Sequence, residues 1–497
     1  MYESVADILL LAAVIAAAVI AVALVAGVGW YWRRWVRRTA RRAHRRFGAR
    51  IDRFKLTSKR YIVDALLNDS EIAAAVRAHA AAHALGERAV WARVRIYLNE
   101  IVPAFSLLMY YQFGYAASRA LLGLFYKVSV DYVRRESIDE LPRESIVVYL
   151  MNHRSNADFA LASYALAGQV AISYAVGEWA RVFPLEYLFK SFGSYFIRRR
   201  YREPLYHTVL ERYVQLITRN GVTQGIFPEG GLTRDGRLRP SKVGLFDYLL
   251  GVAREPGFAE RIYVIPVALN YDRVLEDRTL LRELHGAAGA GETEGAPRRS
   301  RFAQLGEVLH YASWNVGRIL SRRWKRYGRA AVVIGEPIAV KPWLDELAAT
   351  GAPLFERTRA DRLGAVQQFC DTVMVRIGAI IPVTPVPLAC AALQTLDADW
   401  VPRQRLLDRL GELRDVLVER GARVLQADRE VEESWERAYR MLRMRRMVAR
   451  VGDGYVLLPR GRELVNYYAN SVAHLCGEFE QAVRARDQLP VDGMIGR

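Results

Sequence analysis

Residues 146–158 read IVVYLMNHRSNAD, and they join a short apolar run to a polar segment. The run at 146–150 is mostly β-branched, so it predicts a strand. The polar residues after it predict a loop, and a helix that begins near Ser155 would hold Asp158 in its first turn. A strand that continues through a loop into a helix is the repeating unit of α/β proteins.

Runs of this kind recur between residues 145 and 338 and alternate with helical stretches. The predicted strands are residues 146–150, 170–174, 195–197, 222–227, 262–270 and 330–334. Strands that alternate with helices predict a central, mostly parallel sheet flanked by helices on both faces. We therefore expect an α/β domain, the candidate catalytic domain, at residues 141–340.

A long apolar segment precedes this domain. Residues 8–32 contain no formal charge, and as a helix these 25 residues would extend roughly 37 Å at ~1.5 Å per residue. That length crosses a hydrocarbon layer of ~30 Å, so residues 1–32 are predicted to form a transmembrane anchor. A signal peptide is the alternative, but its apolar region is usually about 7 to 15 residues and its basic residues come first.

Nine arginines follow the apolar segment directly, with no acidic residue among them: Arg33, Arg34, Arg37, Arg38, Arg41, Arg42, Arg45, Arg46 and Arg50. The positive-inside bias predicts a single-pass protein of the inner cell membrane with its catalytic domain on the cytoplasmic side. Arginine pairs recur every four residues, which places them on one helix face against anionic phospholipid. Residues 33–140 are predicted to be a basic juxtamembrane and helical region.

Residues 341–497 are predicted to be a helical C-terminal region. Within it, VARVGDGYVLLP at residues 448–459 predicts a hairpin that turns at Asp453 and Gly454. Helices followed by a hairpin can form a winged-helix-like module, but packing against a larger domain is the favoured interpretation. The Gly- and Ala-rich residues 285–300 predict a mobile surface loop.

The composition limits the partners. A formal charge of +19 implies attraction to an anion, which can be nucleic acid, a phospholipid surface or a phosphorylated substrate. The three cysteines, Cys370, Cys390 and Cys476, form no CxxC pair. The sequence therefore predicts neither a disulfide framework nor a metal site.

His153 and Asp158 are the candidate reactive pair of the first segment. An Asp that holds one imidazole nitrogen leaves the other nitrogen to take a proton from a substrate hydroxyl. A His near a strand end is also often purely structural. The chain has no serine elbow of the GxSxG type, so a Ser nucleophile with His153 as its base is not favoured.

Three further segments fall at the ends of predicted strands, where open α/β sheets bind ligands. GSYFIRRR at residues 193–200 can direct guanidinium groups at a phosphate. FPEGGLTR at residues 227–234 can turn sharply, with Glu229 ordering the loop, and it continues to the basic Arg237, Arg239 and Lys242. VIPVALNYDR at residues 264–273 predicts a buried strand in which Pro266 lacks a ladder donor. A solvated basic turn and a plain glycine turn remain alternatives to phosphate binding.

In this order and at these spacings, the four segments resemble the motifs of the glycerolipid acyltransferases. They are most similar to the branch of bacterial and mitochondrial glycerol-3-phosphate acyltransferases, and the peroxisomal dihydroxyacetone-phosphate acyltransferases are near relatives. The resemblance covers residues 146–273 and, more loosely, LVNYYANS at residues 464–471.

The resemblance implies a role for each motif. His153 and Asp158 would act as a charge-relay pair, and Pro266 would mark the acyl-donor side. Residues implied in binding glycerol phosphate are Gly193, Arg198, Arg199, Glu229, Gly230, Gly231 and Arg234. Where the branch usually has an Arg after the Gly-Gly pair, this chain has Leu232. Either that phosphate contact is lost in this chain, or Arg237 or Lys242 supplies it.

The expected reaction moves a fatty-acyl group from acyl-CoA or acyl carrier protein to the sn-1 hydroxyl of glycerol 3-phosphate. The product would be lysophosphatidate, the first intermediate of phospholipid synthesis, and no cofactor would be needed. Lysophosphatidate and dihydroxyacetone phosphate are competing acceptors. A membrane-tethered nucleic-acid-binding protein is the rival from another class, but the arginines gather beside the apolar segment and in the motifs.

Overall fold

The computed structural model describes residues 54, 57–104, 115–166, 172–177, 185–191, 193–198, 201–289 and 326–477. The predicted transmembrane anchor, the basic cluster behind it and most of the loop predicted at 285–300 lie outside these ranges. Within them, no helix has both the length and the apolar character needed to cross a bilayer.

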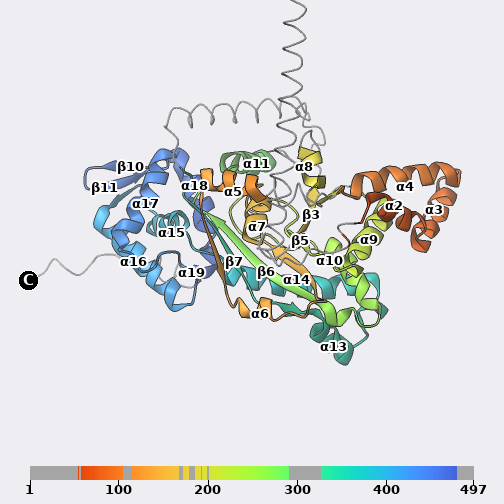
Figure 1. The fold of residues 1–497 in the computed structure, drawn as a ribbon. Helices are drawn as coiled ribbons and strands as arrows, with labels where there is room; N and C mark the ends of the chain where they lie inside the picture. Colours follow the sequence, from red (N-terminus) through yellow and green to blue (C-terminus); the bar gives the residue numbers. More distant parts are fainter. Residues whose placement is uncertain are drawn as a thin grey trace, which may run out of the picture.

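The central sheet has eight strands in the order β1-β7-β6-β2-β5-β3-β4, with β8 beside β6. It lies at the centre of the fold (Figure 1). Its strands are β1 (Lys127–Tyr132), β2 (Ile146–Met151), β3 (Ser173–Gly177), β4 (Tyr195–Ile197), β5 (Gln224–Ile226), β6 (Ile262–Tyr271), β7 (Arg329–Ile334) and β8 (Ile338–Ala339). The pairings among these described strands are parallel except for those of β6 with β7 and β8. The predicted mostly parallel α/β sheet is confirmed.

Both faces of the sheet are covered, and β2 shows why. All its residues are buried, and its side chains alternate between two apolar cores. Val148 and its even-numbered neighbours join the core formed with α2 (Lys59–Leu67), α3 (Ser70–Ala82), α4 (Glu87–Ile101), α9 (Pro204–Arg219), α10 (Gly244–Leu250), α13 (Val340–Thr350) and α14 (Arg359–Ala379). Tyr149 and its odd-numbered neighbours join the core formed with α5 (Tyr115–Phe125), α7 (Asp158–Leu166), α11 (Asp277–Gly289) and the C-terminal helices.

The part of the C-terminal region that follows α14 shares the second of these two cores. Figure 1 shows it beside the sheet. Its elements are α15 (Pro385–Leu396), β9 (Trp400–Pro402), α16 (Arg403–Glu419), α17 (Val431–Met444), β10 (Val448–Val451), β11 (Gly454–Leu457), α18 (Pro459–Asn470) and α19 (Ala473–Cys476). The predicted hairpin is confirmed as β10 and β11, and β9 adds a third antiparallel strand. Because buried residues of the hairpin and helices share one core with the sheet, the region packs against the α/β domain, as favoured.

Several predicted boundaries were wrong. The sheet begins before residue 141, because β1 pairs in parallel with β7 at the sheet edge. β1 was missed because it is half exposed and reads KVSVDY, without an apolar run. β3 lies a few residues later than predicted, and α11 continues to Gly289 through the start of the predicted loop. The described connections also contain the short helices α6 (Glu136–Asp139) and α8 (Leu185–Ser191) and the 3-10 helices η4 (Gly251–Arg254), η5 (Ala259–Arg261) and η6 (Leu354–Glu356).

Pro266 lies inside β6, where a proline normally disrupts a ladder. β7 ends at Ile334, opposite Val267, and β8 begins at Ile338, opposite Val264. The missing N–H of Pro266 therefore falls at the break between these two partners. Gly335 N–H donates to the Pro266 carbonyl at 2.8 Å, which closes the break without needing that donor.

Candidate active site

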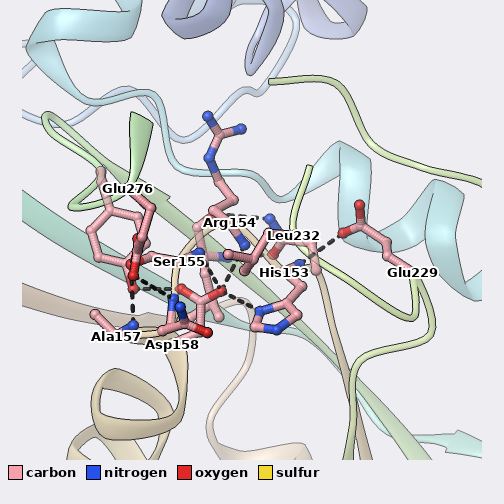
Figure 2. A network of polar contacts seen from close by, with 12 residues as sticks. His153, Arg154, Ser155, Ala157, Asp158, Glu229, Leu232 and Glu276 are labelled. Atoms are coloured by element: carbon pink, nitrogen blue, oxygen red, sulfur yellow. Dashed lines mark hydrogen bonds and ion pairs between the residues drawn. The ribbon is translucent and has the colours of Figure 1, made fainter. Parts of the chain in front are cut away.

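His153 and Asp158 meet where β2 ends and α7 begins (Figure 2). His153 Nδ1 lies 2.9 Å from Asp158 Oδ2, so the predicted contact is confirmed. The helix starts at Asp158, slightly later than expected. Because a carboxylate oxygen accepts, Nδ1 holds the proton of the neutral ring and Nε2 is left as a proton acceptor.

Four donors surround the Asp158 carboxylate. Oδ2 also accepts the N–H groups of Arg154 at 2.7 Å and Ser155 at 3.0 Å. The hydroxyl of Tyr271, the last residue of β6, donates to Oδ1 at 2.5 Å. Burial and the negative charge of Asp158 raise the pKa of Tyr271 well above its usual value of 10, so the hydroxyl remains a donor. Hydrogen bonds to both of its oxygens thus hold the Asp158 carboxylate in place.

The imidazole of His153 is only 2% exposed. It stacks on Phe227 with the ring centroids 4.2 Å apart, and the edge of Phe159 meets it at 5.6 Å. These rings fix the imidazole plane while Asp158 fixes its rotation. No hydrogen bond joins Nε2 to any residue that the structure describes. A base in this position is held out of bulk water, which strengthens its electrostatic interactions.

Glu229 fixes the backbone of His153. One carboxylate oxygen accepts the His153 N–H at 2.7 Å and the other accepts the Arg239 N–H at 3.0 Å. Thr233 N–H donates to the His153 carbonyl at 3.1 Å. The prediction that Glu229 orders its loop is confirmed. Burial raises the pKa of Glu229 to about 7, and the two N–H donors partly oppose that rise.

Two of the predicted glycines adopt backbone angles that side chains disfavour. Gly230 has φ +65° and Gly193 has φ +82°. A Cβ at Gly230 would lie 2.8 Å from the Cδ of Lys242. The turn thus brings the stem of Lys242 against Gly230, and Gly231, which follows, is half-buried. Binding roles for these glycines stay predictions.

The basic residues predicted for phosphate binding differ in their surroundings. Lys242 is exposed, and no ion pair joins it to a carboxylate in the described part of the chain. Arg234 is also exposed and pairs with Glu283 at 3.3 Å. An ion pair between two exposed side chains contributes only about 0–1 kcal/mol, so Arg234 can exchange Glu283 for a phosphate at little cost.

Arg198 pairs with a carboxylate of a neighbouring helix. Its Nε and Nη2 donate to the two oxygens of Glu100 in α4, at 2.9 and 2.6 Å. The aromatic rings of Tyr97, Tyr201 and Tyr206 surround the guanidinium. Arg198 thus ties β4 to α4, and its role in binding phosphate stays a prediction. Arg199 lies outside the described residues, and Pro266, predicted for the donor side, is buried within the sheet.

A second set of contacts supports the loop at residues 152–157 and was missed from the sequence. Ser155 Oγ donates to Glu276 at 2.8 Å, and Asn156 N–H donates to the same carboxylate at 3.2 Å. The Asn152 side chain bridges the N–H and carbonyl of Leu269 in β6. Burial raises the pKa of Glu276. The only signal in the sequence was the polar character of the loop itself.

The C-terminal helix α18 also reaches this loop. The Arg154 side chain extends away from the imidazole (Figure 2) and donates to the carbonyl of Gly236 at 2.9 Å. Its guanidinium lies 5.4 Å from the ring centroid of Tyr467. Asn470 donates to the carbonyl of Asp235 at 2.9 Å. The weak resemblance at residues 464–471 therefore corresponds to a helix that holds the site loops.

Two family descriptions match the chain. Residues 132–270 match "Acyltransferase", and residues 313–477 match "Glycerol-3-phosphate acyltransferase C-terminal region". The first includes the His153 loop, and the second includes α18. In the described ranges, no cluster of three or more His, Cys, Asp or Glu side chains could hold a metal ion. The expectation of no metal site stays a prediction.

Curated relatives agree with these matches. A glycerol-3-phosphate acyltransferase of Aeromonas hydrophila is 26% identical over 430 residues, which cover 85% of this chain and 50% of the relative. One of Pseudoalteromonas translucida is 26% identical over 435 residues, with the same coverage. The chain spans about half the length of these relatives. A 1-acyl-sn-glycerophosphate acyltransferase from Thermotoga maritima, known from a crystal structure, is 18% identical in sequence to this chain. The superposition covers 49% of this chain and 80% of the Thermotoga chain, with a TM-score of 0.27.

Proposed function

We propose that this chain, a member of the glycerol-3-phosphate acyltransferase family, acylates the sn-1 hydroxyl of glycerol 3-phosphate to give lysophosphatidate. The observation that supports this most directly is the pair formed by His153 and Asp158. The pair holds an imidazole with Nδ1 protonated and Nε2 able to accept a proton. Such a base suits the activation of an alcohol.

The reaction proceeds by direct transfer. His153 Nε2 removes the proton of the sn-1 hydroxyl while the oxygen attacks the thioester carbonyl carbon. Asp158 stabilises the imidazolium that forms. The tetrahedral intermediate then collapses, the C–S bond breaks, and the imidazolium returns its proton to the leaving thiolate. No acyl-enzyme, metal or redox cofactor takes part.

The phosphate of the acceptor binds to the loop that follows β5. Lys242 and Arg234 are exposed cations on this loop, and Glu229 and Thr233 tie the same loop to the backbone of His153. A phosphate held there would place the sn-1 hydroxyl of glycerol 3-phosphate near His153. Orientation of this kind supplies a large part of the rate enhancement. Leu232 stands where the resembled branch usually has an arginine, and it packs against the core. Lys242 and Arg234 therefore take over the phosphate contact of that arginine.

The acyl donor is acyl-CoA or acyl carrier protein, and the enzyme works at a membrane. The uncharged residues 8–32 anchor it in the cell membrane in a single pass, and the nine arginines after them hold the catalytic domain against cytoplasmic anionic lipid. A long-chain acyl product partitions into the same bilayer.

The test is an acylation assay with the full chain in lipid discs. Glycerol 3-phosphate, lysophosphatidate and dihydroxyacetone phosphate are each offered with one long-chain acyl thioester. We expect glycerol 3-phosphate to have the highest kcat/KM. His153→Ala should lower kcat by at least about a hundredfold, since a general base contributes roughly 10²–10⁴-fold.

The matched control is His83→Ala, which removes a histidine at the end of α3, away from the base. It should retain the activity of the parent. Full activity in His153→Ala, or a preference for another acceptor, would overturn the respective part of the proposal.

A further inference from the structure

A cavity opens beside the sheet, apart from the His153 loop. Its volume is about 610 Å³, which falls in the ~300–1,000 Å³ range of small-molecule sites. It lies where β1 and β7 begin and β6 ends, and α17 forms its opposite wall. Its charged lining residues are Lys127, Asp272, Arg326, Arg329, Arg437 and Arg440.

The lining contains five cations and a single carboxylate. Both oxygens of Asp272 are already taken, by the N–H of Arg329 at 2.7 Å and that of Val386 at 3.0 Å. Arg437 pairs with Glu433. Across the described part of the chain, no ion pair joins Lys127, Arg326 or Arg440 to a carboxylate. The cavity therefore keeps an excess of positive charge that Asp272 and Glu433 do not balance.

The buried cation of the cavity indicates the same excess. Arg329 is 9% exposed, and its Nη1 finds a neutral partner, the Ser129 hydroxyl, at 3.3 Å. Burial lowers the pKa of Arg329, and the positive charge of Arg437 lowers it as well, against the opposing effect of Asp272. An anion bound among these side chains would offset this repulsion.

The remaining wall is apolar. Pro385, Met441 and Met444 line it beside the arginines. Methionine thioethers adapt to irregular surfaces and contact aromatic rings favourably. Guanidinium groups bind phosphate in bidentate fashion and also stack on flat rings. The lining thus fits a phosphorylated molecule that has an aromatic part, which is the chemistry of a nucleotide.

The cavity lies at the same end of the sheet as the base. β2 and β6 are parallel, so the end of β6 lies beside the end of β2. Tyr271, the last residue of β6, reaches Asp158, and Asp272, the next residue, lines the cavity. From β2 across β6 and β7 to β1 there are three strand spacings of ~4.8 Å, or roughly 14 Å.

We propose that this cavity binds the nucleotide phosphates of acyl-CoA, with the base against the methionines and the flexible pantetheine arm extending past the end of β6 to His153. This inference rests on the proposed function only for the identity of the donor. Acyl carrier protein, whose phosphopantetheine bears no adenosine phosphates, would leave this cavity empty.

The first experiment measures binding without turnover. Adenosine 3′,5′-bisphosphate is titrated calorimetrically into the full chain in detergent, and the soluble phospholipid dihexanoyl phosphatidylglycerol is titrated separately. We expect the nucleotide to bind and Arg440→Gln to weaken it about tenfold, the loss of one charge-assisted phosphate contact. The matched control is Arg443→Gln, on the same helix but not in the lining, which should bind like the parent.

The second experiment compares two donors of the same acyl chain, acyl-CoA and an acyl-pantetheine that lacks the nucleotide. The kcat/KM for acyl-CoA divided by that for acyl-pantetheine should fall about tenfold in Arg440→Gln and stay constant in Arg443→Gln. A purely structural effect of Arg440 would lower both values and leave the ratio unchanged.

The outcomes separate this inference from the proposed function. Nucleotide binding that Arg440→Gln leaves intact, or tighter binding of the phospholipid than of the nucleotide, would overturn the inference. A chain that binds the nucleotide but transfers no acyl group to glycerol 3-phosphate from either donor would refute the proposed function and leave the inference standing.

Discussion

Replacing Tyr271 with phenylalanine removes one hydroxyl and leaves the ring in place. That hydroxyl donates to Asp158 Oδ1 at 2.5 Å in a fully buried position. A hydrogen bond to a charged group contributes about 1.5–3 kcal/mol. Three donors remain on Oδ2, so the carboxylate keeps its orientation and the loss should fall near the lower figure.

A loss of about 1.5 kcal/mol in the transition state corresponds to roughly a tenfold fall in kcat. The KM for glycerol 3-phosphate should change little, because the hydroxyl acts through Asp158 and not on the substrate. Steady-state kinetics of Tyr271→Phe, with the folded fraction measured by circular dichroism, check both numbers.

Tyr126→Phe is the matched control. Its ring lies 5.4 Å from that of Tyr271, and its hydroxyl donates to the Arg273 carbonyl at 2.8 Å. It loses a buried hydroxyl from the same aromatic cluster without touching the reactive pair. If the two variants have equal kcat values, Tyr271 has no positioning role.

Three further changes test the surroundings of the site. Burial raises the pKa of Glu229 from 4.5 to about 7, so the contribution of this side chain to stability is greatest below pH 4.5 and is lost as the pH rises to 7. Glu229→Gln should therefore flatten the pH dependence of the free energy of unfolding between pH 4.5 and 7, measured with urea, and should lower kcat. An unchanged pH dependence would contradict the assignment. Gly236→Ala places a Cβ 1.9 Å from the Tyr467 carbonyl oxygen at a φ of +89°, so we expect a loss of about 3 kcal/mol or more in the free energy of unfolding and faster proteolysis of α18. The control is Gly221→Ala, because Gly221 also has a positive φ but its Cβ would meet no atom. Arg198→Met removes the ion pair and both hydrogen bonds that the guanidinium gives to the buried Glu100, and it should cost about 2–3 kcal/mol. Most of this loss should be restored by Glu100→Gln in the double variant, whereas strictly additive effects would show that the pair is not coupled.

The parts of the site that were predictable are those formed by residues close in the sequence. His153 and Asp158 are five residues apart, so a strand end and a helix start suffice to bring them together. The ordering role of Glu229 was predictable for a similar reason, because a Gly-Gly turn after a strand restricts what the preceding side chain can reach.

Contacts between distant residues were not predictable. Glu100 pairs with Arg198 across 98 residues, and no local pattern distinguishes an arginine that binds phosphate from one that binds a carboxylate on another helix. Tyr271 reaches Asp158 across 113 residues, and its strand position alone gave no sign of that partner. The edge strand β1 was missed because half-exposed strands lack the apolar run that marks buried ones.

The contact of α18 with the site loops has a consequence for the timing of synthesis. Asp235 emerges from the ribosome 235 residues before its partner Asn470. At roughly 5–20 residues per second this interval lasts about 10 to 50 s. During it the nascent chain already includes its histidine base but lacks the helix that fixes the neighbouring loops. Until translation has passed α18, the loops beside His153 lack the contacts that Tyr467 makes with Arg154 and that Asn470 makes with Asp235.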